Sequence, residues 1–134
     1  MLTKLHLHRD DRGQAQVEIA LCLLTLLVVI FVTVELCSAL YTYVVLSDAV
    51  NEGVRYAIVH STDTGGAGTR TKVTTYAANT LHDMSGMTVD VQYPDGQTVP
   101  GRVQVRATYP YLPYTGFMTT PPTMHAYAEG RLVY

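Results

Sequence analysis

The sequence predicts an α+β protein, in which one long N-terminal helix spans a membrane and continues as a spine, followed by a short helix and a small antiparallel β-sheet. Two observations lead to this fold class. Val17–Leu36 supplies the roughly 20 mostly apolar residues that a membrane-spanning helix needs. From Ser61 onward, apolar and polar residues alternate instead. Because 134 residues leave room for one small domain behind the helix, we expect one anchor and one head.

Polar side chains interrupt the apolar stretch at only four places, Glu18, Thr25, Thr33 and Glu35. Each threonine hydroxyl can bond a carbonyl one turn back along the helix, so neither forbids a membrane position. A carboxylate costs about 2.5–3.5 kcal/mol at the centre of a membrane helix. Glu18 therefore either pairs with a cation or reaches water at the headgroups, and Glu35 is expected to reach water at the opposite edge.

The helical period continues beyond the apolar stretch to Val59. Gly53 within this spine indicates either a close approach by the head or an interior glycine without a packing role. Tyr41 and Tyr43 mark the outer membrane interface or belong to the core of the spine, and Glu52 with Arg55 forms an i,i+3 ion pair. The predicted buried stripe is Leu36, Leu40, Tyr43, Ser47, Val50, Val54 and Ala57.

The remaining residues, 61–134, are predicted to form the head. Residues 61–68 read as a loop because of their glycines, and residues 69–82 have the spacing of a short amphipathic helix. Three stretches alternate as strands do: Met87–Tyr93, Arg102–Tyr109 and Met124–Tyr134. A third strand is required, because two strands alone are marginally stable.

The segment Tyr109–Pro122 contains four prolines and is predicted not to form an interior strand. Its tyrosines Tyr109, Tyr111 and Tyr114 are the candidate surface contact of the head, since tyrosine provides a large contact area at low ordering cost. They could meet a neighbouring subunit or an external surface. The alternative is that their rings cover the open edge of the sheet.

Composition argues against several classes of function. The net charge is −2, and charges of both signs are interspersed along the head, so we predict no nucleic-acid partner. The five histidines lack ligand spacing and no serine or cysteine lies in a nucleophile motif, so we predict no enzyme, cofactor or metal site. Cys22 and Cys37 lie about 22 Å apart on one helix and cannot bridge each other.

The N-terminus combines a short polar leader with an apolar run that begins only afterwards. An ordinary secretory signal places its apolar stretch before the cleavage site, whereas here Gly13 precedes the run. If the chain is cut between Gly13 and Gln14, Glu18 becomes the fifth mature residue. This order resembles that of type IV pilins.

Two stretches narrow the resemblance. Arg12-Gly13-Gln14-Ala15-Gln16-Val17-Glu18-Ile19-Ala20-Leu21 and Val34-Glu35-Leu36 through Asp48-Ala49-Val50-Asn51-Glu52-Gly53-Val54-Arg55-Tyr56-Ala57 are similar to the TadE-like pseudopilin family. Many relatives carry a proline early in the apolar run, where this chain has Leu24-Thr25-Leu26. The resemblance implies a pilin-like fold and a structural role in a Tad-type pilus or secretion filament, with a part in adhesion and biofilm formation.

The resemblance also implies partners: a prepilin peptidase, other pilin subunits or further copies of this chain through the N-terminal helix, the inner-membrane assembly platform, and membrane lipid. Glu18 is then an assembly contact that pairs with the freed amine of a neighbouring Gln14. The expected division is a cytoplasmic leader (1–13), a transmembrane and spine helix (14–60) and a periplasmic or extracellular head (61–134). The alternative is an uncleaved single-pass anchor in the bacterial inner membrane that carries a binding module.

Overall fold

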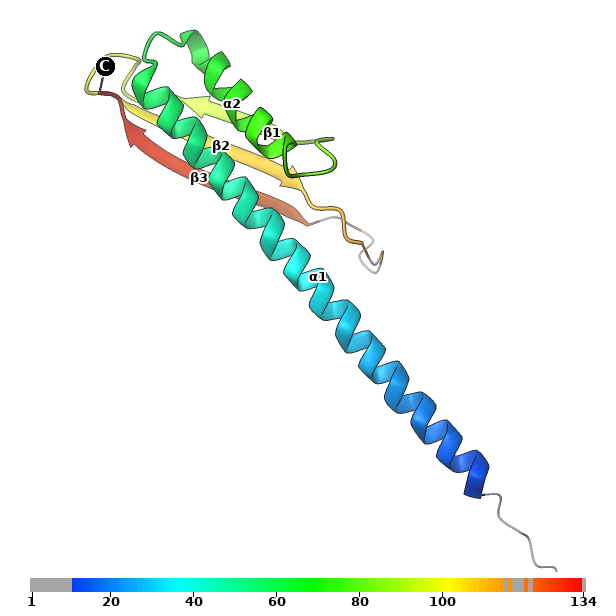
Figure 1. The fold of residues 1–134 in the computed structure, drawn as a ribbon. Helices are drawn as coiled ribbons and strands as arrows, with labels where there is room; N and C mark the ends of the chain where they lie inside the picture. Colours follow the sequence, from blue (N-terminus) through cyan, green and yellow to red (C-terminus); the bar gives the residue numbers. More distant parts are fainter. Residues whose placement is uncertain (1–10, 115, 117–119, 121, 134) are drawn as a thin grey trace, which may run out of the picture. The chain divides into compact units, whose positions relative to one another are not determined.

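The computed structural model describes residues 11–114, 116, 120 and 122–133. The elements are helix α1 (Asp11–Val59), a 3-10 turn η1 (Thr64–Gly66), helix α2 (Ala67–Ala78) and strands β1 (Thr88–Gln92), β2 (Arg102–Pro110) and β3 (Thr123–Arg131) (Figure 1). This confirms the predicted α+β class and the end of the long helix. The chain divides into two compact units between Val34 and Glu35. Residues 35–59 of α1 therefore belong to the same unit as the sheet.

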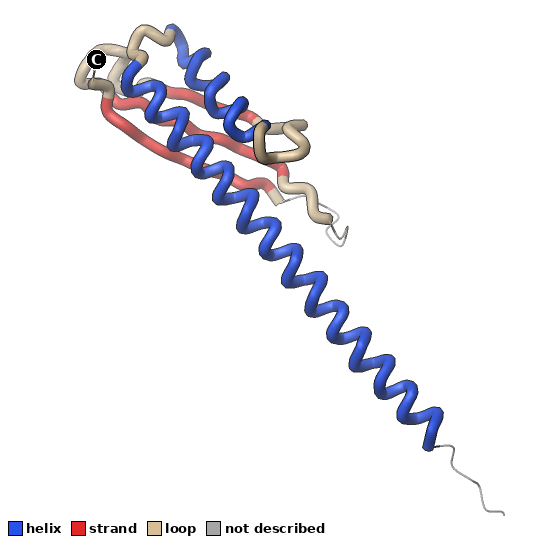
Figure 2. Tube along the Cα trace, in the orientation of Figure 1, coloured by secondary structure: helices blue, strands red, loops and turns tan. Residues whose placement is uncertain are grey.

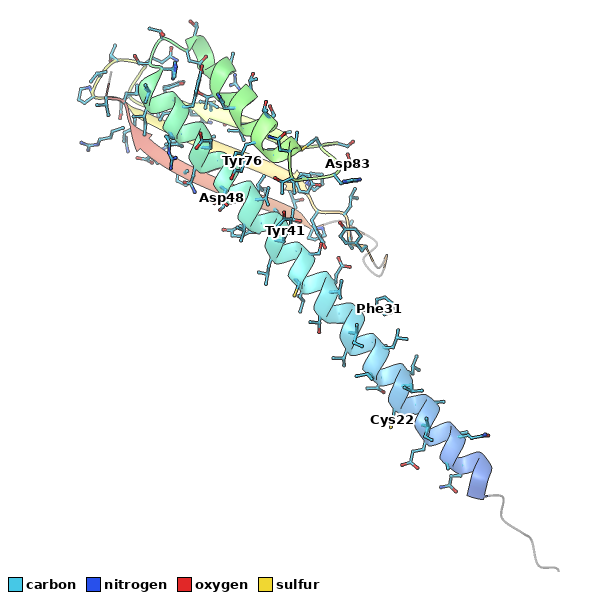
Figure 3. All side chains as sticks on the ribbon, in the orientation of Figure 1. Cys22, Phe31, Tyr41, Asp48, Tyr76 and Asp83 are labelled. Atoms are coloured by element: carbon cyan, nitrogen blue, oxygen red, sulfur yellow. The ribbon has the colours of Figure 1, made fainter. Side chains whose placement is uncertain are left out.

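In the first unit, α1 is apolar on all sides from Ile19 to Val34, apart from two threonines. Its side chains are exposed from Gly13 to Val34, and Figure 3 shows Cys22 and Phe31 projecting outward. As the sequence predicted, the hydroxyl of Thr25 donates to the Leu21 carbonyl at 2.9 Å and that of Thr33 to the Val29 carbonyl at 2.8 Å. These bonds satisfy both hydroxyls without water.

The second unit is a three-stranded antiparallel sheet with helices on one face. The strand order is β1-β2-β3, and Val105 at the centre lies opposite Val91 and Ala128. Figure 2 shows the later part of α1 and all of α2 on the same side of this sheet. The core between them draws on all these elements: Val45, Leu46, Ala49, Val50, Val54 and Ala57 of α1, Val73 and Ala77 of α2, and Val91, Val103, Val105, Ala107 and Ala126 of the strands.

The buried stripe of α1 differs from the predicted stripe at its N-terminal end. Val50, Val54 and Ala57 are buried as predicted, but Leu36, Leu40 and Tyr43 are exposed. The buried face instead begins at Thr42, whose hydroxyl bonds the Ser38 carbonyl, and continues through Val45, Leu46 and Ala49. Residues 36–46 are apolar on nearly every face of the helix, so their periodicity does not select the face that the sheet covers.

Gly53 lies where helices α1 and α2 pack closely together. A Cβ there would clash with Cγ2 of Val73 in α2, because the two atoms would be closer than non-bonded carbons come. Gly130 plays the same part on β3, where a Cβ would lie 2.6 Å from Cγ1 of Val54. Of the two interpretations left open for Gly53, the structure supports the close approach.

Asp63 organises the start of α2. One carboxylate oxygen accepts the Gly68 N–H at 2.9 Å, and the other accepts the N–H and hydroxyl of Thr69 at 2.8 and 2.9 Å. Burial raises the pKa of Asp63, but these bonds and the charge of Arg70 outweigh it, so the pKa lies below the usual 3.8. The stabilisation is complete above the unfolded-state pKa and is lost as the pH falls through the lower folded value.

The bounds of the other elements differ slightly from the predicted ones. Helix α2 begins at Ala67, inside the predicted loop, and ends at Ala78 rather than near residue 82. Strand β2 extends to Pro110, although the segment from Tyr109 was predicted to contain no interior strand. Proline is tolerated there because β2 has already passed its last pair with β1, Thr88 with Thr108, and pairs only with β3, as an edge strand does. Tyr134, predicted on the inner face of the third strand, lies outside the described residues.

Candidate functional site

The predicted cleavage site lies in the first turns of α1. Gly13, Gln14 and Glu18 are all exposed, and a Cβ built at Gly13 would meet no other atom within 4 Å. Gln14 and Glu18 are four residues apart and share one helix face, about 6 Å apart along the axis. Both are therefore open to contact from another chain, while residues 1–10 of the predicted leader lie outside the described residues.

The apolar part of α1 is long enough to cross a membrane. The helix contains an 18-residue window of mean hydropathy 2.8, and none of that window is buried in the protein. An unburied apolar surface of this length requires lipid or other helices around it. The structure therefore supports a single-pass membrane anchor.

A hydrogen bond joins the segment after β2 to Glu35, the first residue of α1 that belongs to the second unit. The Tyr111 hydroxyl donates to Oε1 of Glu35 at 2.7 Å, and only 4% of Tyr111 is exposed. The backbone N–H of Tyr111 donates in turn to the Pro122 carbonyl at 2.9 Å, just beyond the end of β2. Burial raises the pKa of Tyr111, and the bond to Glu35 raises it further. We call this hydrogen bond the Tyr111–Glu35 tether.

Beside the tether lies an open cavity of about 280 Å³. Its walls come from α1, from the segment that follows α2 and from the segment that follows β2: Ser38, Tyr41, Thr42, Thr80, Leu81, His82, Asp83, Tyr109, Tyr111, Leu112 and Tyr114. The Tyr109 hydroxyl donates to the Asp83 carbonyl at 2.7 Å, so this hydroxyl, like that of Tyr111, is engaged within the protein. The cavity lies just below the usual range of small-molecule pockets, about 300–1,000 Å³.

The described N-terminal helix can be compared with known families. Residues 13–55 match the family of TadE-like proteins. This confirms the resemblance seen in the sequence, and the TadE-like segment begins at Gly13 and includes both Glu18 and Glu35. It points to a pilin-like protein associated with a Tad pilus. Searches among curated proteins and among solved structures returned no match.

The three tyrosines predicted as a surface contact differ in exposure. Tyr114 is 80% exposed, as that prediction requires, but Tyr109 and Tyr111 are only 6% and 4% exposed. The correction has a local cause: Tyr109 belongs to β2 and faces the core, and the ring of Tyr111 packs beside the helix to reach Glu35. Of the three, only Tyr114 is available to a partner in the chain as described.

Sequence reasoning missed the parts played by Glu35 and Asp63. Glu35 was expected to reach water, yet it accepts a bond from a residue 76 positions away, and nothing in the sequence near Glu35 indicates that pairing. Asp63 did carry a signal, because an aspartate shortly before a helix is a common capping residue. The glycines that follow it concealed the start of α2.

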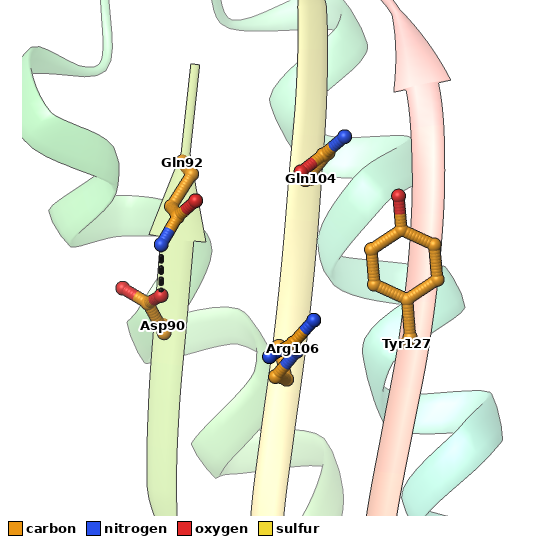
Figure 4. Close-up of a pocket in the computed structure, with 5 residues that line it drawn as sticks. All are labelled: Asp90, Gln92, Gln104, Arg106 and Tyr127. Carbon is orange, nitrogen blue, oxygen red and sulfur yellow. Dashed lines mark hydrogen bonds between the residues drawn. The ribbon is translucent and has the colours of Figure 1, made fainter. Parts of the chain in front are cut away.

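The face of the sheet opposite the helices is polar. A shallow hollow of about 50 Å³ on this face is lined by Asp90, Gln92, Gln104, Arg106 and Tyr127. Figure 4 shows these five side chains and the hydrogen bond that Gln92 donates to Asp90, which is 2.7 Å long. Hydrogen bonds from Tyr127 and Gln104 lower the pKa of Glu129 at its edge. This volume is too small for an organic ligand. Among the described residues, no three His, Cys, Asp or Glu side chains are grouped so as to hold a metal ion.

Tyr111→Phe is expected to lower the free energy of unfolding of the head by about 1.5–3 kcal/mol, because it removes a hydrogen bond to a half-buried carboxylate. Chemical unfolding of the chain in detergent micelles, followed by tyrosine circular dichroism, measures this.

The matched control is Tyr127→Phe, which removes the 2.5 Å bond to Glu129 on the exposed face of the sheet. It is expected to change stability by about 0.5 kcal/mol or less. Equal effects of the two substitutions would contradict a structural role for the Tyr111–Glu35 tether.

Proposed function

We propose that this chain is a TadE-like minor pilin, or pseudopilin: a structural subunit that a prepilin peptidase cuts between Gly13 and Gln14 and that takes part in assembling a Tad-type pilus or secretion filament. The observation that carries the proposal is the TadE-like segment, which starts at Gly13 and leads directly into an unburied apolar helix. In this proposal the leader is cytoplasmic, the helix crosses the bacterial inner membrane and the head is periplasmic.

The chemistry of Glu18 supports a role in assembly. A carboxylate at the edge of the hydrocarbon needs a cation, since moving it deeper costs about 2.5–3.5 kcal/mol. Cleavage after Gly13 would create such a cation, the α-amine of Gln14, and a neighbouring subunit would present it to Glu18. The low dielectric of the membrane strengthens an ion pair of this kind. Cleavage would thus generate the group that assembly requires.

The same proposal indicates which surfaces of the chain would contact the other partners. Apolar helix surfaces that none of the described residues covers would pack against other pilin subunits or against further copies of this chain, at the inner-membrane assembly platform. The head, with Tyr114 exposed, would remain outside the membrane, where a filament meets surfaces and other cells. Adhesion and biofilm formation are the processes to which such a filament would contribute.

Cleavage is tested by the mass of the mature protein. Co-expression with a prepilin peptidase is expected to yield a membrane protein whose first residue is Gln14, as measured by intact-mass spectrometry. A Gly13→Val variant serves as the control and should keep its full length, because a branched side chain blocks the cut. Wild-type protein that retains Met1–Gly13 would instead favour an uncleaved anchor carrying a binding module.

Substitution of Glu18 tests the assembly contact. Glu18→Ala is expected to be cleaved normally but to enter filaments, or cross-linked complexes of subunits, much less than the wild type. Glu18→Asp keeps the charge and should assemble better than Glu18→Gln, which keeps the shape alone. If Glu18→Gln assembles as well as the wild type, Glu18 does not contribute to assembly through an ion pair.

A further inference from the structure

An uncharged, largely apolar surface lies in the second unit, residues 35–134, close to its start on α1. Residues 36–47 contain no Asp, Glu, Lys or Arg, and neither do residues 107–124 of the head. On α1, Leu36, Leu40 and Tyr41 are 61%, 66% and 58% exposed. On the head, Leu112 and Tyr114 are also exposed. We call these five residues the collar.

The head part of the collar is held against α1 rather than free. Leu112 and Tyr114 directly follow Tyr111, which is tethered to Glu35, and both line the same cavity as Tyr41. The tether therefore fixes the segment 111–114 at the level of Glu35 on the helix. The two exposed side chains of the head accordingly lie near the exposed residues that follow Glu35 along α1.

The spacing of the two acids of α1 places that level at the membrane surface. Glu18 and Glu35 lie roughly 26 Å apart along the helix, close to the ~30 Å thickness of the bilayer hydrocarbon. With Glu18 at one edge, Glu35 reaches the other. Leu40 follows about 7.5 Å further along, which is within the headgroup layer. Tyrosine rings are enriched at this depth, because one end of the ring is apolar and the other forms hydrogen bonds.

We propose that the collar inserts into the outer lipid–water interface, so that the head is held against the bilayer by Leu112 and Tyr114 as well as by α1. This inference rests on the membrane-spanning part of the proposed function, but not on cleavage or assembly. The occupant is the boundary between headgroups and acyl chains of a neutral phospholipid. His82 and Asp83, which also line the cavity, are polar and suit the headgroup side.

The position next to the apolar helix favours lipid over a second copy of the chain as the occupant. A surface that begins at the last residue of a membrane-length apolar run, Leu36, reaches lipid whenever that run is inserted, whereas a protein partner must first be captured. The collar is apolar, whereas the outer face of the sheet is polar. This is the difference in polarity expected between a surface that faces lipid and one that faces water.

Tryptophan fluorescence tests the proposal cleanly, because the chain contains no tryptophan. Leu112→Trp and Tyr114→Trp would be prepared separately in the full chain and placed in phosphatidylcholine nanodiscs whose lipids carry bromine either near the headgroup or deep in the acyl chain. Both are expected to emit at shorter wavelength than an exposed tryptophan and to lose most of their fluorescence to the shallow bromines.

Two further variants separate the possible failures. The Phe31→Trp substitution is in the apolar part of α1, and the fluorescence of this variant should be quenched by deep bromines if α1 crosses the bilayer. Thr98→Trp lies in the exposed turn between β1 and β2, at the opposite end of the sheet from Tyr111, and should not be quenched. If Phe31→Trp is quenched while Leu112→Trp and Tyr114→Trp behave like Thr98→Trp, the collar proposal is wrong and the anchor stands. If Phe31→Trp is not quenched, both fail.

A charge on the collar gives an independent check. Leu112→Asp, combined with Tyr114→Trp, is expected to weaken quenching of the tryptophan, because a carboxylate resists entry into the interface. Leu112 is exposed, so the unfolding of the head should not change. Unchanged quenching in this double variant would contradict insertion. A shift in emission that depends on protein concentration rather than on lipid would identify a second copy as the occupant and overturn the proposal.

Discussion

The packing of residues 42–58 of α1 against the three-stranded sheet is the interaction on which the rest of the second unit depends. The sheet has one polar face and one apolar face, and α1 and α2 together cover the apolar one. Full burial of a Val or Leu side chain contributes about 1.5–3 kcal/mol. Val45, Leu46, Val50 and Val54 together therefore contribute roughly 6–12 kcal/mol, comparable with the total stability of a domain of this size, about 5–15 kcal/mol.

The two parts of α1 thus have different surroundings. Between Gly13 and Val34 its apolar side chains are exposed, and they require lipid or other helices. From Thr42 onward the same helix buries one face in the head and exposes charged residues such as Asp48 and Arg55 on the others. Between these parts, the Tyr111–Glu35 tether connects the end of β2 to the helix. The assembly proposed above would use the first part of α1 and leave the core formed by the second part unchanged.

The sequence predicted the features that depend on local patterns. The apolar run, the length of α1 and the antiparallel strands follow from hydropathy and from alternation, and the threonine hydroxyl bonds follow from helix geometry. The resemblance around Gly13 and Glu18 also rested on short, local motifs, and the match over residues 13–55 confirms it.

Contacts between distant residues could not be predicted in this way. The burial of Tyr109 and Tyr111 depends on how the end of β2 meets α1, and the residues around Tyr111 carry no trace of Glu35. Leu36 and Leu40 were predicted to be buried but are exposed, because the sequence of a helix that is apolar on nearly every face does not indicate which face a sheet will cover. Composition marked 109–122 as an unusual segment, but only the fold separates its buried tyrosines, Tyr109 and Tyr111, from the exposed Tyr114.

The sheet and the second part of α1 form one unit, so the structural boundary lies near Glu35 rather than at the end of the helix. Amide NMR spectra of two fragments, 35–134 and 61–134, test this most directly. We expect dispersed resonances and cooperative unfolding for 35–134, and poorly dispersed resonances for 61–134, which lacks the part of α1 that covers the sheet. A well-dispersed spectrum of 61–134 that matches the sheet resonances of the longer fragment would show that the sheet folds without α1.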